Sequence, residues 1–286
     1  MMKTHPLHRL TIWIGVALLL IWSLGPIYWT LVSSITPPGD FSARPIHFFP
    51  VHFTLQHFER LLGINVDRIG GVEVWAQFRA ALVNSIITAI GSTILCVAIA
   101  ALGGYAFTRL NFPGRRTLFL AVVATLAIPG YAVLIPLYRL MIGAHLIDTY
   151  LGVTLIYVSA YLPLTLWLMR SVFESLPIAL EEAARIDGAG RLHVFFFIVV
   201  PLAGPGLTAA AILTFIGAWG QYLVPLVFSP THTKPLTVLI PEFVTKNFID
   251  YGLITAAGAI AIVIPALVVI FLNRYLVSGL LAGSIK

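Results

Sequence analysis

The charged residues between Leu180 and Pro201 are the part of the sequence whose types and spacing most clearly predict an interaction. Glu181 and Arg185 lie four residues apart, in the order that favours an ion pair on a helix. Gly188 follows them and can adopt the positive φ that ends a helix. These residues form no catalytic set, and their spacing predicts a short helix with a residue able to end it. The alternative interpretation is a generic amphipathic loop without a specific partner.

The faces of this predicted helix differ in chemistry. Glu182 points away from the small side chains and is left to meet a partner. Pro177 lies in the first turn, where proline is favourable. We therefore predict that residues 175–196 form a rigid lever between two apolar segments. One face allows another surface to approach closely, and it carries Leu180, Ala183, Ala184 and Asp187.

Motifs for nucleotide, metal or acyl chemistry are absent from the sequence. No Gly-Lys dipeptide occurs, which excludes a Walker A phosphate loop, and neither His-Glu-x-x-His nor Gly-x-Ser-x-Gly is present. The eight histidines are scattered without the spacing of metal ligands. We expect no catalytic residue, no metal site and no cofactor bound by this chain.

Polar side chains inside apolar segments are candidates for a substrate path. They are Asn84, Ser85, Trp219, Gln221 and Tyr222. Aromatic faces beside amide groups suit sugars, which offer C–H patches and hydroxyl groups. The alternative interpretation is structural, with Asn84 and Gln221 bonding between helices. In that interpretation Trp219 and Tyr222 belong to an interfacial aromatic belt.

The composition predicts a membrane protein. Of the 286 residues 59% are hydrophobic and 10% are charged, with a mean hydropathy of +0.97, whereas about a quarter of a soluble domain is charged. Six charge-free runs reach the length of about 20 residues that a spanning helix needs. Prolines at the ends of the fifth run predict bends there. We expect an all-α polytopic fold with six transmembrane helices, over residues 11–33, 81–106, 117–140, 150–171, 197–227 and 252–274.

The distribution of Lys and Arg predicts the orientation. With the N-terminus in the cytoplasm, ten of the 17 basic residues fall on the cytoplasmic side, as the positive-inside rule requires. Both termini and residues 175–196 are then cytoplasmic. The net charge of +6 lies in short loops and indicates topology rather than nucleic-acid binding. The first run is too long for the core of a cleaved signal, which predicts an uncleaved anchor.

The segment of residues 34–79 is the largest outside the apolar runs, and the orientation places it outside the cell. A proline-rich beginning is followed by an amphipathic stretch that predicts a short helix. Two interpretations are equally favoured: a docking surface for an extracellular partner, or a packed cap over the helices. No repeat or linker divides the sequence, so we predict a single membrane domain over residues 1–286.

The spacing in the charged stretch resembles the EAA loop of ABC importer permeases. That motif is Glu-Ala-Ala, three residues, Gly, nine residues, Ile, one residue and Leu-Pro. Val200 replaces the usual Leu, and the other positions are matched by Glu182, Ala183, Ala184, Gly188, Ile198 and Pro201. Further segments resemble the carbohydrate-uptake branch of maltose-permease type, namely Phe112-Pro113-Gly114 and residues 128–138, 148–152 and 279–286.

The resemblance implies the type I fold of ABC importer permeases and sugar import across a bacterial plasma (inner) membrane. The cargo would be a mono- or oligosaccharide, or a related polyol or glycoside. The loop from Glu182 to Gly188 would dock on a separate ATP-binding subunit, which works as a dimer and holds ATP and Mg²⁺. The resemblance also implies a second permease subunit and an extracellular or periplasmic sugar-binding protein.

One departure from the family and one alternative function remain. The sugar branch often has Trp-Asn and an acid where this chain has Trp219-Gly220-Gln221-Tyr222, so substrate contacts there do not carry over. The alternative is a self-contained secondary carrier or channel for a small polar solute. Apart from Arg139, Arg170 and Arg274 at their ends, the spans contain no Asp, Glu, Lys or Arg, which argues against ion coupling, although backbone carbonyls can bind sodium. A membrane-embedded enzyme lacks a catalytic set.

Overall fold

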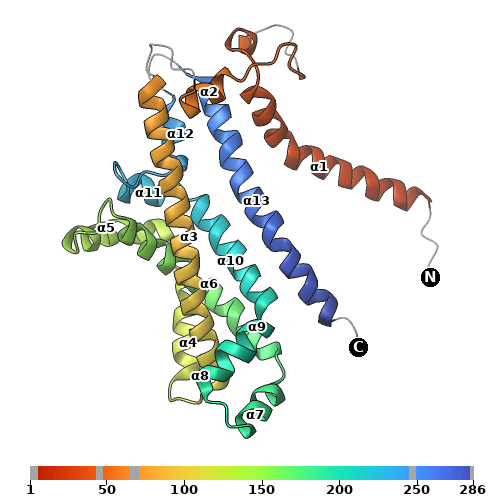
Figure 1. Ribbon diagram of the computed structural model, residues 1–286, viewed down its shortest axis with the longest axis vertical. Helices are drawn as coiled ribbons and strands as arrows, with labels where there is room; N and C mark the ends of the chain where they lie inside the picture. Colours follow the sequence, from red (N-terminus) through yellow and green to blue (C-terminus); the bar gives the residue numbers. More distant parts are fainter. Residues whose placement is uncertain (1–5, 43–47, 65–70, 245–248, 284–286) are drawn as a thin grey trace. The chain divides into compact units, whose positions relative to one another are not determined.

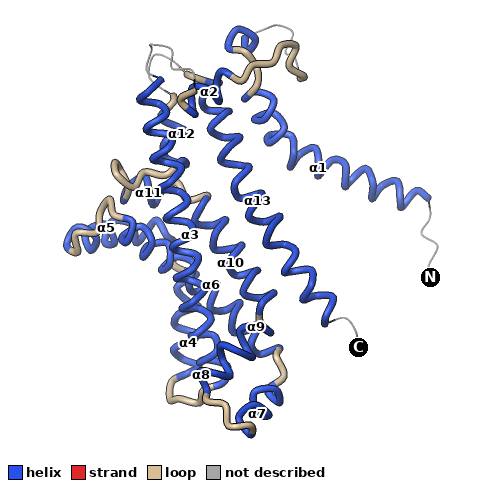
Figure 2. The backbone as a smooth tube through the Cα atoms, in the orientation of Figure 1, coloured by secondary structure: helices blue, strands red, loops and turns tan. Residues whose placement is uncertain are grey.

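The computed structural model describes residues 6–42, 48–64, 71–244 and 249–283, and these residues form helices joined by loops (Figures 1 and 2). The predicted all-α fold is confirmed. Within the described ranges, the only extended pairing is a single bridge between Val244 and Ile249. The chain divides into two compact units, Met1–Arg79 with Leu239–Ile264, and Ala80–Val238 with Pro265–Lys286. The single membrane domain over residues 1–286 stays a prediction.

The first unit contains the N-terminal helix and the short helix predicted in the outer segment. It comprises α1 (Pro6–Ser34), the 3-10 turn η1 (Pro38–Ser42), α2 (Gln56–Leu62), and the beginnings of α3 and α13. Residues 43–47 and 65–70 of the predicted outer segment lie outside the described residues.

Helix α2 packs against the beginning of α13 (Tyr251–Gly283). The His57 side chain is buried, and a Cβ atom on Gly252 would collide with its ring. Arg60 Nη1 lies 2.9 Å from Asp250 Oδ2, an ion pair just before α13. Within its own unit α2 therefore has the contacts of a packed cap, one of the two interpretations of this segment.

Helix α3 (Gly71–Arg109) is longer than the predicted second span, which began at residue 81. Its 39 residues extend about 58 Å, while the hydrocarbon core of a bilayer is about 30 Å thick. A helix can continue beyond the surface of the membrane, so the length of a charge-free run underestimates the length of the helix. The helix continues from the second predicted span into the segment assigned to the outer loop.

The predicted third span, residues 117–140, is broken in the middle. The segments Arg115–Ala127 and Gly130–Gly143 meet at 96°. Pro129 lacks an N–H group and disfavours helical backbone in Ile128, whose ψ is 121°. Figure 1 shows α5 directed away from the axis of α4. The elements are α4 (Arg115–Ala124), the 3-10 turns η2 (Thr125–Ala127) and η3 (Gly130–Val133), and α5 (Leu134–Gly143).

The predicted fifth span, residues 197–227, is also divided, with a bend of 76° between Arg191–Leu202 and Gly204–Trp219. Pro201 cannot donate a backbone hydrogen bond, and a wide π-helical turn precedes it. This bend lies where the sequence predicted one. The elements are α8 (Arg191–Val194), the π turn η4 (Phe195–Val199), α9 (Val200–Leu202), α10 (Gly204–Trp219) and α11 (Leu223–Phe228).

The core of the second unit lies around α6 (Tyr150–Ser175) and α10, which contact each other along their length. Glycines allow this close approach, since a Cβ on Gly206 would lie 2.5 Å from Val172 and one on Gly217 would lie 2.6 Å from Tyr161. The remaining helices are α7 (Ile178–Ile186) and α12 (Leu236–Glu242). Among the residues that the structure describes, four helices are long and apolar enough to cross a membrane, or up to six if each bent pair is one span.

Candidate functional site

Helix α7 is the short helix predicted within residues 175–196, and Figure 1 shows it beyond the ends of α6 and α8. Its C-terminus is a Schellman motif: Gly188 N donates to Arg185 O at 3.1 Å, and Ala189 N donates to Ala184 O at 3.0 Å. Gly188 has a φ of +89°, the left-handed value that glycine adopts most easily. The predicted helix stop at Gly188 is therefore confirmed.

Glu181 is the buried anchor of this helix, with 2% of its surface exposed. Its Oε1 accepts a hydrogen bond from Arg109 Nε at 2.5 Å, and its Oε2 accepts one from Tyr105 Oη at 2.9 Å. The predicted partner, Arg185, is more distant, with its Nη2 3.8 Å from Oε2. Both Arg109 and Tyr105 come from α3 and were not predicted as site residues.

The outer side of α7 is exposed at several positions. Glu182, Ala183 and Asp187 are exposed, and Ala184 is half-buried against the core. Ile186 is 87% exposed, although it is a large apolar side chain at the end of a charged helix. Only its presence among polar neighbours could have identified it from the sequence.

The two remaining residues of the motif lie where the chain enters the bundle again. Ile198 belongs to the π turn and is half-buried, and Pro201 is in α9 and exposed. Both precede the 76° bend, so the motif runs from α7 to the break in the fifth span.

A cavity of about 870 Å³ lies in the second unit, between the two broken spans. Its wall includes the break between Ala127 and Gly130, the turn that follows α10 after Trp219 with the beginning of α11, and part of α6. Backbone polar groups that leave a helix within a membrane require protein partners or a water-filled space. Its volume is within the range of pockets that hold small ligands, about 300–1,000 Å³.

Two of the predicted path residues, Gln221 and Tyr222, line this cavity, together with Tyr131 from the other break. Gln221 Nε2 donates a hydrogen bond to Tyr161 Oη at 2.6 Å, which fixes the amide at the cavity wall. Trp219 is buried and stacks on Phe215, with ring centroids 5.7 Å apart, and is not part of the wall.

Asn84 and Ser85 are buried away from the cavity. The Asn84 amide donates to the carbonyl oxygens of His232 and Lys234, both at 2.9 Å, and accepts from Tyr150 Oη at 2.6 Å. Ser85 Oγ accepts from the backbone N–H of Leu236 at 2.8 Å. The polar atoms of both side chains are thus used to hold the segment before α12 against α3, which is the structural alternative considered for Asn84.

The turn between α5 and α6 is tied to the same segment through Asp148. Its carboxylate accepts hydrogen bonds from the backbone N–H groups of His232 at 2.8 Å and Thr233 at 2.9 Å, and from the Thr233 hydroxyl at 3.0 Å. Burial by itself would raise the pKa of this carboxyl. The hydrogen bonds outweigh burial and hold the pKa of Asp148 below its usual range.

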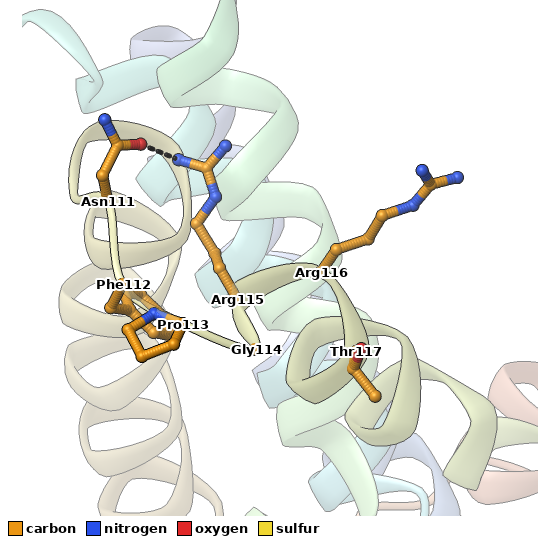
Figure 3. Close-up of a pocket in the computed structure, with 7 residues that line it drawn as sticks. All are labelled: Asn111, Phe112, Pro113, Gly114, Arg115, Arg116 and Thr117. Atoms are coloured by element: carbon orange, nitrogen blue, oxygen red, sulfur yellow. Dashed lines mark hydrogen bonds between the residues drawn. The ribbon is translucent and has the colours of Figure 1, made fainter.

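The Phe112-Pro113-Gly114 turn connects α3 to α4 (Figure 3). Gly114 has a φ of +76° directly before α4. Arg115 Nη1 donates to Leu110 O at 3.0 Å and to Asn111 Oδ1 at 3.3 Å, so the side chain folds back over the turn. Arg116 points away in Figure 3. Among the described residues, no cluster of His, Cys, Asp or Glu has the arrangement of a metal site.

Comparison with known proteins gives consistent matches. The family described as "Binding-protein-dependent transport system inner membrane component" matches residues 96–281. A probable ABC transporter permease of Pyrococcus horikoshii is 34% identical, over 94% of this chain and 96% of that protein. The trehalose/maltose transport system permease MalG of Thermococcus litoralis is 31% identical, over 100% of this chain and 99% of that protein.

Among solved structures, a bacterial ABC transporter involved in the import of the acidic polysaccharide alginate has a similar chain. The TM-score is 0.80 at 21% identity, over 96% of this chain and 98% of that chain. At this identity the likeness establishes a shared fold.

Proposed function

Because the chain belongs to the family of inner membrane components of binding-protein-dependent transport systems, we propose that it is the permease subunit of an ABC importer for a sugar. The cargo class is a mono- or oligosaccharide, or a related polyol or glycoside. Relatives named for trehalose/maltose and diacetylchitobiose uptake support this class. The chain is a transport subunit, and the family is not one of enzymes.

The observation that carries the proposal is α7. It is a capped helix whose buried side is anchored by Glu181, while Glu182 and Ile186 are exposed. In the proposed assembly these two side chains dock on an ATP-binding subunit, which holds ATP and Mg²⁺ in a dimer with its copy. Since α7 is joined through α8 to the bent fifth span, movement of the docked subunit is passed to α10.

The cavity between the broken spans is the proposed part of the sugar path contributed by this chain. Tyr131 and Tyr222 offer aromatic faces for the C–H patches of a sugar, and Gln221 offers an amide for its hydroxyl groups. Asn84, Ser85 and Trp219 are not included, because their contacts lie within the protein.

The proposed assembly has four further components: a second permease subunit, two ATP-binding subunits and a sugar-binding protein outside the membrane. The chain resides in the inner membrane, and both termini and α7 are on the cytoplasmic side in this proposal. The excess of Lys and Arg on that side supports the orientation.

The test is ATP hydrolysis by the assembled transporter in lipid discs, with its binding protein and a panel of sugars. One sugar class is expected to stimulate hydrolysis, and Glu182→Gln is expected to abolish the stimulation. Glu174→Gln is the matched control, since Glu174 is an exposed carboxylate at the same end of the bundle but outside α7. Purification without any ATPase, together with ion-driven uptake by the chain alone, would establish a secondary carrier instead.

A further inference from the structure

We infer that Arg109 and Tyr105 are positioning residues that make α7 move together with α3. This inference rests on the proposed function, because it concerns how movement of a docked ATPase reaches the channel. The contacts that carry it are those between the cytoplasmic end of α3 and the Glu181 carboxylate, called here the α3–α7 clamp and consisting of Tyr105, Arg109 and Glu181.

Arg109 joins three segments of the chain at one point. Its Nε donates to Glu181 on α7, and its Nη2 donates to the carbonyl oxygen of Leu176 at 2.9 Å, at the end of α6. The planar guanidinium holds both acceptors in a fixed relation, which a lysine ammonium would not do. Tyr105 adds a second bond to the same carboxylate from one turn earlier on α3.

Chain connectivity alone does not fix the direction of α7. The helix is entered through Leu176 and Pro177, which have extended backbone, and it is left through Gly188 with its positive φ. Another anchor is apolar contact through Ala184 and Ala189, two small side chains at the edge of the core. The clamp is therefore the directional attachment of α7 to the bundle.

A buried ion pair adds little net stability compared with a well-packed apolar pair. Its use at this position is better explained by direction, since hydrogen bonds between charged groups hold a defined geometry. A clamp of this kind lets α7 push or pull α3 without rotating against it.

Helix α3 carries the displacement to the other side of the second unit. It is continuous from Asn84 to Arg109, a distance of about 37 Å along the axis. At its far end Asn84 holds the carbonyl oxygens of His232 and Lys234. A shift of α7 is thus transmitted by α3 to the segment that follows α11.

The test removes the clamp without leaving a buried charge. The variant Arg109→Met with Glu181→Met is assembled with its ATPase subunits, and sugar uptake per ATP hydrolysed is measured in vesicles. We expect a fall of about fivefold or more, the lower end of typical coupling between sites. Tyr105→Phe, which removes one hydroxyl group, should give a smaller fall.

The matched control is Arg170→Met with Glu174→Met, a partly exposed ion pair of the same type on α6. It should keep the uptake per ATP of the wild type. A second readout is the distance between spin labels at Leu102→Cys on α3 and Ala179→Cys on α7, both at exposed positions. The distance distribution should stay narrow with and without nucleotide, and should broaden when the clamp is removed.

The outcomes separate the two proposals. If the wild-type assembly couples hydrolysis to uptake and the clamp variant does so equally well, with an unchanged label distance, the clamp inference is overturned and the importer function stands. If no ATPase subunit associates with the wild-type chain, the proposed function fails and the clamp inference fails with it.

Discussion

Gly217 is the position where the contact between α6 and α10 can be tested most directly. The substitution Gly217→Ala places a Cβ atom 2.6 Å from Cε1 and 2.8 Å from Cζ of Tyr161. Ordinary contact begins at 3.4 Å, so the ring has to move by roughly 1 Å. The ring is half-buried between the helices and cannot move alone, because its hydroxyl accepts a hydrogen bond from Gln221.

Two opposing effects set the magnitude. Overpacking of this kind costs about 1–3 kcal/mol. Alanine gains up to about 1 kcal/mol over glycine in a helix, which offsets part of this loss. Subtracting this gain from the cost leaves a loss of about 0–2 kcal/mol. Because the new Cβ atom meets a ring that a hydrogen bond holds in place, we expect the upper part of this range, so that Gly217→Ala lowers the free energy of unfolding by about 1–2 kcal/mol and the thermal midpoint by a few degrees. Displacement of Gln221 should also raise the sugar concentration that half-stimulates ATP hydrolysis.

The assay is thermal unfolding of the assembled transporter in lipid discs, followed by sugar titration at a fixed temperature. Gly91→Ala in α3 is the control, since the nearest atom to its Cβ would be Thr154 Oγ1 at 3.7 Å. This control should be neutral or slightly stabilising. If Gly217→Ala unfolds at the temperature of the wild type or above it, the close packing of α10 on α6 is refuted.

Three further substitutions test other contacts. Asn84→Leu removes three hydrogen bonds and should lower the free energy of unfolding by about 2–4 kcal/mol, which the thermal midpoint measures; an unchanged midpoint would contradict the arrangement. Asp148→Asn should lower the midpoint at pH 7. The pKa of Asp148 is lower in the folded protein than its ordinary value of about 3.9. The carboxylate therefore contributes its full stabilisation above that ordinary value and loses it as the pH falls through the pKa of the folded state. The difference in thermal midpoint between the wild type and Asp148→Asn should thus narrow below about pH 4. Gly188→Val strains the backbone at a φ of +89°, although no neighbouring atom would meet the new Cβ atom. It should uncouple sugar uptake from ATP hydrolysis while the chain still inserts into the membrane. Loss of folding would refute this role of Gly188.

Local features of the site could be predicted from the sequence, because the information lies within a few residues. The cap at Gly188 and the short helix before it depend on residue types within one or two turns. The six apolar runs likewise follow from length and charge. An apolar run does not determine the direction of its backbone. The sequence therefore predicts the third span but not its break at Pro129.

The partners of Glu181 could not be predicted, because they come from far along the chain. In the sequence, Arg109 is one of the basic residues whose distribution indicates topology, and Tyr105 lies within an apolar run that carries no sign of a polar contact. The pairing of Glu181 with Arg185 was favoured by their spacing of four residues. A buried carboxylate requires closer partners than an exposed helix face supplies, and these become visible only when α3 and α7 are brought together.

Helix α1 has a consequence for how the protein is made. In its span, Leu10–Ser34, none of the described residues of the most apolar window is buried within the chain, and Trp13 and Trp22 are exposed. Such a helix is apolar and long enough to enter the bilayer by its own hydrophobicity. We expect lipid or another subunit to cover α1 after this insertion, so that biogenesis has an early stage of insertion and a late stage of assembly.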